Sequence, residues 1–257
     1  MTRRSLEWLS NFLPSRIHEY ICDIDGIQLL IASNRKDDLL RTVRTKNLNS
    51  MEQGSLLLWK KLASQSNLVL DIGAYTGIYS MTASRSGSKV IAFEPNESIR
   101  SFLYRNLRSN ECSNVTVHHF ALSSRNSTER ILAPKLKFSI QPKSTSSGVQ
   151  LETANSNRDL TKWQSVGEVL TRTLDEVLTE TEMTEVGITK IDVEGAEIDV
   201  LLGATKFLNA TNSFMLIECF DYLQFSKVNE ILSTYNYSLL EIYGVNYLFG
   251  KSQIPLN

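Results

Sequence analysis

The pattern of apolar and polar positions changes near Asn67. Residues 1–66 are mostly polar with helical spacing, and an extended pair around CDIDGIQLLIA interrupts them, with Asp25 and Gly26 as a turn signal. We expect an opening helix, a short strand pair, and then helices through MEQGSLLLWKKLA. These residues form an N-terminal prologue, and residues 67–257 form the main domain.

From Asn67 onward, short apolar runs of strand type alternate with longer segments of helical spacing. The runs are NLVLDIG (67–73), KVIAFEP (89–95), VTVHHFAL (115–122), ITKIDVEG (188–195), SFMLIECF (213–220) and a closing pair, SLLEIYG and NYLFG, within 238–250. Such alternation is typical of βαβ units with a parallel sheet. The closing pair is joined by so few residues that it must be antiparallel. The sequence therefore predicts an α/β fold whose mostly parallel sheet ends in an antiparallel strand.

Residues 123–171 interrupt this rhythm after the third run. They are rich in Ser, Thr, Asn, Lys and Gln, and they contain two strand-like pieces, ERILAP and SGVQLE. A loop of this length is uncommon in a compact domain unless it is functional or disordered. We interpret it as a β-rich insert that lies over the carboxyl edge of the sheet, and the alternative is a plain surface loop.

Composition excludes several classes of protein. The 257 residues are 42% apolar and 21% charged, which is ordinary for one globular domain with additions. The 27 basic and 28 acidic side chains give a net charge of -1, so no general field attracts nucleic acid or anionic lipid. No run approaches the roughly 20 apolar residues that span a bilayer. We expect neither a nucleic-acid partner nor a membrane span, and the oligomeric state stays open.

The three cysteines, Cys22, Cys112 and Cys219, lie far apart in the chain. They form no C-x-x-C pair, so the sequence indicates neither a disulfide framework nor a zinc site. This usage is typical of a reducing compartment, and we expect a cytoplasmic protein.

The strongest local motif is VLDIGAYTGIYS, in which a strand ends at Asp71 and Gly73, Ala74 and Gly77 precede a helix. Glycines allow a ligand to approach the backbone, and free N–H groups at a helix start favour an anionic group. Asp71 can accept hydrogen bonds from an ammonium group. A dinucleotide site would have G-x-G-x-x-G, whose middle glycine is missing here. The loop suits a zwitterionic amino acid, such as the methionine end of S-adenosylmethionine, although a tight turn without a ligand is the alternative.

A second acidic residue, Glu94, ends the next run in AFEP. An acid at this strand tip can bind both hydroxyls of an adenosine ribose. We expect its carboxylate to be satisfied mainly by such a ligand. The alternative is a solvated carboxylate at the end of a strand.

The fourth run ends in KIDVEGAE, which gathers Lys190, Asp192, Glu194 and Glu197. Carboxylates at the end of a buried strand cost free energy unless they are paired, hydrogen-bonded or used. Strand alternation puts Lys190, Asp192 and Glu194 on one side. Ligands of open α/β sheets bind at the carboxyl ends of the strands, so we expect this cluster to face the same crevice as the glycine loop.

The fifth run adds Glu218, within MLIECF. A carboxylate in an apolar run also needs a partner or a task. It could belong to the same crevice, or it could be a charge partner of Lys190 or Arg172.

These segments resemble the FkbM-like methyltransferases. The matching stretches are VLDIGAYTGIYS, VIAFEPNESIRSFLYRNLRSN, VTVHHFALSS, TRTLDEVL, ITKIDVEGAEIDVLLGA and LIECF, and they cover roughly residues 67–220. The resemblance implies the class I methyltransferase fold, a Rossmann-like sheet with strand order 3-2-1-4-5-7-6. It also implies S-adenosylmethionine as cofactor and methyl transfer to the oxygen of a hydroxyl on a sugar, glycolipid, polyketide or similar small molecule.

The resemblance also assigns site residues. The expected cofactor-binding residues are Asp71, Gly73, Ala74, Tyr75 and Gly77 for the methionine end, Glu94, Pro95 and Asn96 at the ribose, Ala121 and Leu122 at the adenine, and Asp192 beside the methyl group. One departure is Tyr75, where the family usually has asparagine.

Methyl transfer to a hydroxyl is an in-line displacement that needs a base near the methyl group. On position alone, Glu194 and Asp192 are the first catalytic candidates and Glu218 is the next. His118 and His119 lie in mid-strand, where one ring of the pair is expected to pack in the core. Whether the carboxylates also hold a divalent metal is not decided by the sequence.

Two other functions remain as alternatives. A NAD-dependent Rossmann oxidoreductase shares the glycine turn and the acid after the second strand, but the missing glycine and the antiparallel closing pair count against it. A non-catalytic cofactor-binding module would keep the fold without turnover.

Overall fold

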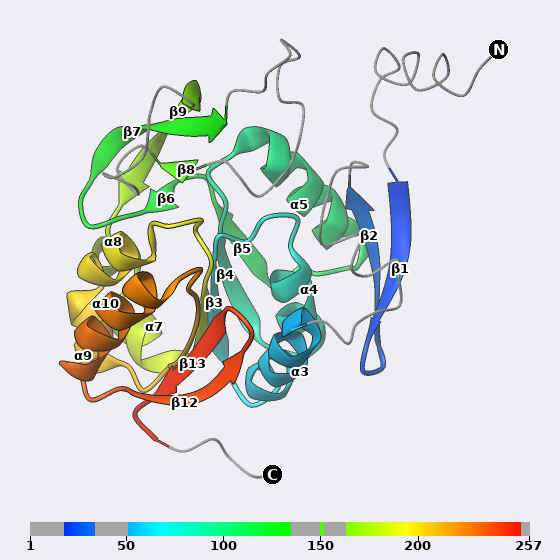
Figure 1. The fold of residues 1–257 in the computed structure, drawn as a ribbon. Coiled ribbons are helices and arrows are strands. Elements are labelled where there is room, and N and C mark those ends of the chain that lie inside the picture. Colours follow the sequence, from blue (N-terminus) through cyan, green and yellow to red (C-terminus); the bar gives the residue numbers. More distant parts are fainter. Residues whose placement is uncertain (1–17, 34–50, 135–149, 152–162, 253–257) are drawn as a thin grey trace.

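A seven-stranded sheet forms the centre of the protein (Figure 1). The computed structural model describes residues 18–33, 51–134, 150–151 and 163–252, so the predicted opening helix lies outside the described residues. The strands of the central sheet are β3 (Leu68–Ile72), β4 (Lys89–Phe93), β5 (Val115–His118), β10 (Val186–Ile191), β11 (Phe214–Glu218), β12 (Ser238–Tyr243) and β13 (Asn246–Gly250).

The order across the sheet is β12-β13-β11-β10-β3-β4-β5. Only β13 runs antiparallel to its neighbours, β11 and β12, while the other pairs are parallel. Numbered along the chain, these strands have the order 3-2-1-4-5-7-6, so the predicted class I methyltransferase topology is confirmed. The strand order reverses between β3 and β10, and open α/β sheets bind their ligands at the carboxyl ends of such a pair.

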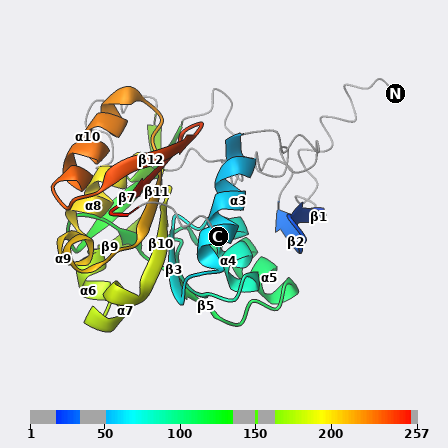
Figure 2. The same ribbon diagram turned by 90° about the horizontal axis from the view of Figure 1, so that it is seen from below.

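Helices cover both faces of the sheet (Figure 2). One face carries α3 (Met51–Ala63), α4 (Ile78–Arg85) and α5 (Glu97–Ser109). The other carries α6 (Leu174–Val177), α7 (Glu180–Glu185), α8 (Glu197–Leu202), α9 (Thr205–Ala210) and α10 (Tyr222–Ser233). Strand β3 supplies both cores, because Val69 packs in the first while Leu68, Leu70 and Ile72 pack in the second. A central parallel strand buried on both faces is expected to be continuously apolar.

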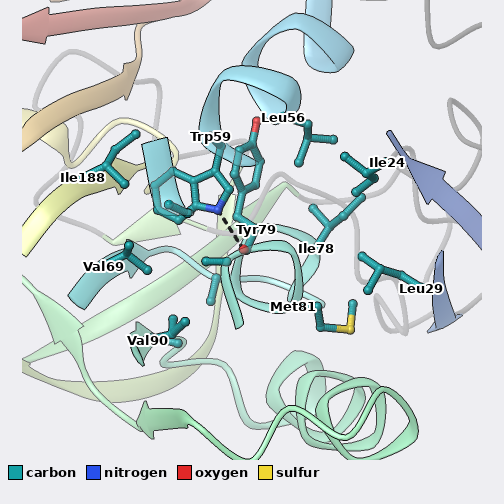
Figure 3. Close-up of a cluster of buried hydrophobic side chains, with 14 of the residues drawn as sticks. Ile24, Leu29, Leu56, Trp59, Val69, Ile78, Tyr79, Met81, Val90 and Ile188 are labelled. Carbon is teal, nitrogen blue, oxygen red and sulfur yellow. Dashed lines mark hydrogen bonds between the residues drawn. The ribbon is translucent and has the colours of Figure 1, made fainter. Parts of the chain in front are cut away.

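The predicted strand pair in the prologue is a β-hairpin of β1 (His18–Ile24) and β2 (Ile27–Ser33). Asp25 and Gly26 form its turn with φ of 49° and 87°. Figure 3 shows Ile24 and Leu29 of the hairpin facing α4. The hairpin therefore covers the outer side of the helix layer that carries the glycine loop.

Asn106 of α5 and Asn110, the residue that caps the end of this helix, hold the edge of β2. Asn106 accepts from Ala32 N at 2.7 Å and donates to Ala32 O at 3.1 Å and to Thr76 O at 2.8 Å. Asn110 pairs with both backbone groups of Leu30 at 2.8 Å. Because Thr76 belongs to the loop between β3 and α4, Asn106 links the hairpin to that loop.

The insert and the residues that directly flank it form a second, four-stranded sheet in the order β6-β9-β7-β8. Its strands are β6 (Ala121–Leu122), β7 (Ser127–Pro134), β8 (Gln150–Leu151) and β9 (Trp163–Arg172). Its predicted β character is thus confirmed. Since β6 begins directly beyond the carboxyl end of β5, the second sheet is attached at the carboxyl edge of the central one. The position of the whole insert over the ligand site stays a prediction, because residues 135–149 and 152–162 lie outside the described part.

The prediction of one continuous strand over residues 115–122 was wrong. Strand β5 ends at His118, which pairs with Phe93, the last residue of β4. Beyond Phe93 no ladder partner exists in the central sheet, so the chain leaves it and Ala121 pairs with Thr171 of β9 instead.

We expect Asn106→Leu to lower the free energy of unfolding by about 3 kcal/mol, because buried backbone groups of Ala32 and Thr76 would lose their partner. Urea denaturation measures the change. Asn209→Ala is the control, since the exposed Asn209 only donates to Thr205 O of its own helix, and it should stay within about 0.5 kcal/mol of wild type. Equal stability of Asn106→Leu and wild type would contradict the role of Asn106.

Candidate active site

The loops after β3 and β10 touch through their backbones. Asp192 N donates to Ile72 O at 2.9 Å, and a Cβ on Gly73 would lie 1.8 Å from Asp192 O. Gly73 N and Ala74 N both donate to Phe93 O, at 3.1 and 3.0 Å. Any side chain at Gly73 would push these loops apart, so a glycine is required there.

Two further positions of the glycine loop have left-handed backbones. Gly77 has φ of 97°, and a Cβ there would lie 2.4 Å from Leu103 Cδ1. Tyr75 has φ of 53°, although a tyrosine adopts this region at a cost that asparagine largely escapes. The departure from the family pattern therefore falls where the backbone favours asparagine, and it places conformational strain in the loop.

Asp71 is 1% exposed and caps helix α4. It accepts from Ser80 Oγ at 2.5 Å and from the Ser80 backbone N–H. Ser80 is the third residue of α4, whose N–H has no partner inside the helix, and the N-cap Gly77 supplies no side chain. Burial raises the pKa of Asp71 to about 6, although the bond from Ser80 and the charge of Lys190 oppose the shift. Direct contact of Asp71 with an ammonium group stays a prediction.

Glu94 is 6% exposed and already has protein partners. Its Oε2 accepts from Tyr75 N at 3.0 Å and its Oε1 from Asn96 N at 2.8 Å. The expectation that this carboxylate is satisfied mainly by ligand was wrong, because the carboxylate fastens the glycine loop to the start of α5. Burial raises its pKa to about 7, and the two backbone bonds partly offset that shift.

The end of β10 holds a buried lysine and a partly exposed aspartate. Lys190 Nζ donates to Asp192 Oδ2 at 3.1 Å and to Asn246 Oδ1 at 2.9 Å. It also lies 5.1 Å from the centroid of the Tyr79 ring. The side chain of Lys190 is 1% exposed and that of Asp192 is 31% exposed. Asp192 is therefore the member of this ion pair that a ligand can reach.

Glu218 is the neighbour of this pair. Burial raises its pKa well above the ordinary value, the negative charge of Asp192 adds to the rise, and a hydrogen bond joins the two carboxyl groups. These surroundings favour the protonated form of Glu218, which can donate to Asp192. A neutral Glu218 supports a base rather than acting as one.

The two remaining glutamates of KIDVEGAE have different places. Glu194 has φ of 55°, because the chain turns there after β10 has ended at Ile191, so the predicted strand alternation was wrong for Glu194. Its charge nevertheless raises the pKa of Glu218, which makes the two carboxyl groups neighbours. Glu197 is fully buried and accepts from Val193 N at 3.1 Å, from Gly195 N at 3.0 Å and from the Gln224 amide. Glu197 holds the turn that presents Asp192.

The expected adenine-side residues lie at the start of the insert. Ala121 and Leu122 are buried, and Leu122 packs in the same cluster as Ile72 and Phe93 at the ends of β3 and β4. The ring of His118 stacks on Phe93 with 5.1 Å between centroids. A role of Ala121 and Leu122 in an adenine pocket stays a prediction.

Within residues 18–33, 51–134, 150–151 and 163–252, no group of three His, Cys, Asp or Glu side chains is arranged to hold a metal ion. No helix in those ranges is long and apolar enough to cross a membrane. The loop after β11 and the first turn of α10 expose three apolar side chains, those of Phe220 (52%), Tyr222 (81%) and Leu223 (62%).

Sequence reasoning missed Ser80, Tyr79 and Asn246. The signal for a partner existed in Lys190, because a lysine inside an apolar strand must be paired when buried. The sequence could not tell that its partner lies 56 residues away in the closing strand.

We expect stability to fall as pH rises from about 4.5 to 7. Glu94 has a folded pKa of about 7, above the unfolded value, so the folded state binds the extra proton in this window and loses that advantage as the proton leaves. Glu94→Gln should reduce this fall in the free energy of unfolding by up to about 3 kcal/mol. Urea denaturation at several pH values checks it, with the exposed Glu97→Gln as control. A wild-type stability that is flat over this range would contradict the assignment.

A family of known proteins is similar to this chain in sequence. Residues 71–239 match the family model described as the methyltransferase FkbM domain. No curated protein matches the sequence. The chain is similar to a solved methyltransferase FkbM from Methylobacillus flagellatus, with 18% identity and a TM-score of 0.47 over 72% of this chain and 43% of that one. It thus spans less than half the length of that protein.

Two further solved structures have comparable similarity. A precorrin-6y C5,15-methyltransferase from Geobacter metallireducens has 13% identity and a TM-score of 0.44, covering 76% of this chain and 84% of its own. A 16S rRNA N2 G1207 methyltransferase from T. thermophilus, in complex with AdoMet and guanosine, has 12% identity and a TM-score of 0.48, covering 94% and 52%. Because the family match extends over residues 71–239, well over half of the chain, the protein belongs to the FkbM methyltransferase family.

Proposed function

We propose that the protein transfers a methyl group from S-adenosylmethionine to a hydroxyl oxygen of a small molecule or glycan. The observation that carries the proposal is the contact of the glycine loop with the partly exposed Asp192, since a Cβ on Gly73 would lie 1.8 Å from Asp192 O. This contact puts a cofactor-type loop and a carboxylate acceptor of protons at one edge of the sheet.

The residues of the glycine loop fit the cofactor. Each oxygen of a carboxylate can accept more than one hydrogen bond, so Glu94 keeps acceptor capacity for ribose hydroxyls beyond its two backbone bonds. The hydroxyl of Thr76 is buried without a hydrogen-bond partner among the described residues. We assign Gly73, Ala74, Tyr75 and Gly77 to the methionine end, because this loop follows β3 at the carboxyl edge of the sheet, where open α/β sheets bind their ligands.

Asp192 is the base that we favour for the acceptor hydroxyl. The cofactor supplies an activated methyl group, and the chain must align the acceptor and accept its proton. Asp192 is reachable, is ion-paired with Lys190, and can receive a hydrogen bond from the protonated form of Glu218. Glu194 is the second candidate, because it lies in the same turn at a strained backbone position.

The acceptor site would lie between Asp192 and the loop that follows β11. The exposed Phe220, Tyr222 and Leu223 begin two residues after Glu218. Apolar side chains at a site rim suit an acceptor that carries an apolar part beside its hydroxyl. The polar insert, with Arg125 and Arg130 exposed on its described part, would contact the more polar portion.

We expect the purified protein to bind S-adenosylmethionine and S-adenosylhomocysteine with micromolar affinity, or about 8 kcal/mol, and to leave NAD unbound. The physical reason is the absence of a middle glycine on which a pyrophosphate could pack. Isothermal titration calorimetry measures all three. Binding of NAD with no response to either adenosyl compound would overturn the proposal.

We expect Asp192→Asn to lower methyl transfer at least about 100-fold, the usual effect of losing a general base. The assay incubates the protein with radiolabelled S-adenosylmethionine and a small-molecule extract of the source organism, and it counts label in products. S-adenosylhomocysteine affinity should change less than about tenfold. Glu230→Gln, an exposed position on α10, is the control. A wild-type protein that binds cofactor but labels nothing would favour the non-catalytic module.

A further inference from the structure

Lys190 is a buried cation at the centre of the acidic cluster. Its side chain is 1% exposed, so a ligand in the crevice cannot reach it. In the sheet it lies directly beside Asp71 of β3, and it donates to Asp192 at 3.1 Å. It therefore stands between a carboxylate that caps the cofactor loop and a carboxylate that faces the crevice.

Two elements besides β10 contact the ammonium group, and a third supports one of them. Asn246 of β13 accepts from it at 2.9 Å through Oδ1. Tyr79 of α4 places its ring 5.1 Å below it, and the Tyr79 hydroxyl is hydrogen-bonded to Ser55 of α3 at 2.8 Å. A cation confined by an amide oxygen and an aromatic face has little freedom to leave Asp192.

Asn246 has a buried side-chain donor without a partner among the described residues, and the contact of its other side-chain atom with Lys190 explains why an asparagine lies there. The residue is 1% exposed, and its Nδ2 has no hydrogen-bond partner among the described residues. An unsatisfied buried donor destabilises a fold. Asn246 lies opposite Glu218 in the sheet register, where its Oδ1 directs Lys190 toward Asp192.

We propose that Lys190 is a positioning residue: it orients the Asp192 carboxylate toward the crevice and stabilises negative charge in the acidic cluster where the adenosyl cofactor would bind. This inference rests on the proposed function, because it assumes an adenosyl cofactor at the glycine loop. The charged and titratable groups around Lys190 are Asp71 of β3, Asp192 and Glu194 after β10, Glu218 of β11, Cys219 directly after β11 and Tyr79 of α4. Burial raises the pKa values of Asp71, Glu218 and Cys219, and the charge of Lys190 opposes each rise.

Removal of the cation should have a defined sign. The charge of Lys190 lowers the pKa of Asp71 and of Glu218, so its loss raises both. The pH at which the crevice acquires negative charge should therefore move upward.

The experiment compares two ligands that differ in charge at sulfur. S-adenosylmethionine carries a positive sulfonium and S-adenosylhomocysteine a neutral thioether, so the ratio of their affinities reports negative charge at that position. We would measure both by calorimetry between pH 5.5 and 8.5 on the full chain and on Lys190→Met. As the pH falls, the preference of the protein for S-adenosylmethionine over S-adenosylhomocysteine should disappear. The pH at which it disappears should be about one unit higher in Lys190→Met than in wild type.

Two further variants keep the outcome unambiguous. Lys190→Gln removes the charge but can still donate a hydrogen bond, so it gives the same shift even where Lys190→Met folds poorly. Lys251→Met is the matched control, because Lys251 lies 5.0 Å from the Tyr237 ring centroid and donates to Leu208 O at 2.7 Å, away from the acidic cluster. It should keep the wild-type pH dependence.

An unchanged pH dependence in folded Lys190→Met or Lys190→Gln overturns the inference and leaves the proposed function standing. A shift of equal size in Lys251→Met also overturns it, since the effect would then follow from a general loss of stability. A wild-type protein that binds neither adenosyl compound overturns the proposed function, and the inference with it.

Discussion

The site depends on one backbone contact, the approach of the loop after β3 to the loop after β10. Gly73 leaves no room for a side chain against Asp192 O, and Asp192 N is bonded to Ile72 O. This contact fixes the distance between the glycine loop and the acidic turn. The carboxylate of Glu94 constrains the glycine loop further, because it accepts a hydrogen bond from Tyr75 N. The crevice is thus framed by main-chain geometry before any ligand binds.

That frame brings several acids into a small volume, and each acid is accommodated in its own way. The carboxylate of Asp71 accepts a hydrogen bond from Ser80 and thereby caps the start of α4. Glu94 and Glu197 accept backbone N–H groups of the loops that they hold. The surroundings of Glu218 favour its protonated form, and Asp192 keeps a buried cation as partner. Because these four acids are occupied by protein partners, the partly exposed carboxylates left in the turn after β10 are those of Asp192 and Glu194, a distinction that residue type alone cannot make.

The resemblance to a known family predicted the strand order, whereas the edge at which the acids gather was predicted from the alternation of runs and from the rule that ligands bind at strand tips. Prediction from the sequence failed where the outcome depends on contacts between distant segments. The break after His118 depends on where β4 ends, and the turn at Glu194 depends on packing beyond β10. The partners of Glu94 are backbone N–H groups, and no pattern of side chains in the sequence predicts such partners.

The support of the site also extends beyond the residues that match the family. Asn246, which directs Lys190, and Ser55, which bonds Tyr79, lie outside residues 71–239, as does the N-terminal hairpin. The hairpin nevertheless reaches the glycine loop, because Asn106 bonds both Ala32 and Thr76. Tyr75, one residue before Thr76, has a strained left-handed backbone. Such a backbone persists only where the surrounding contacts hold it in place. The prologue and the closing strand therefore belong to the physical support of the site, and the loop conformation of this chain follows from both.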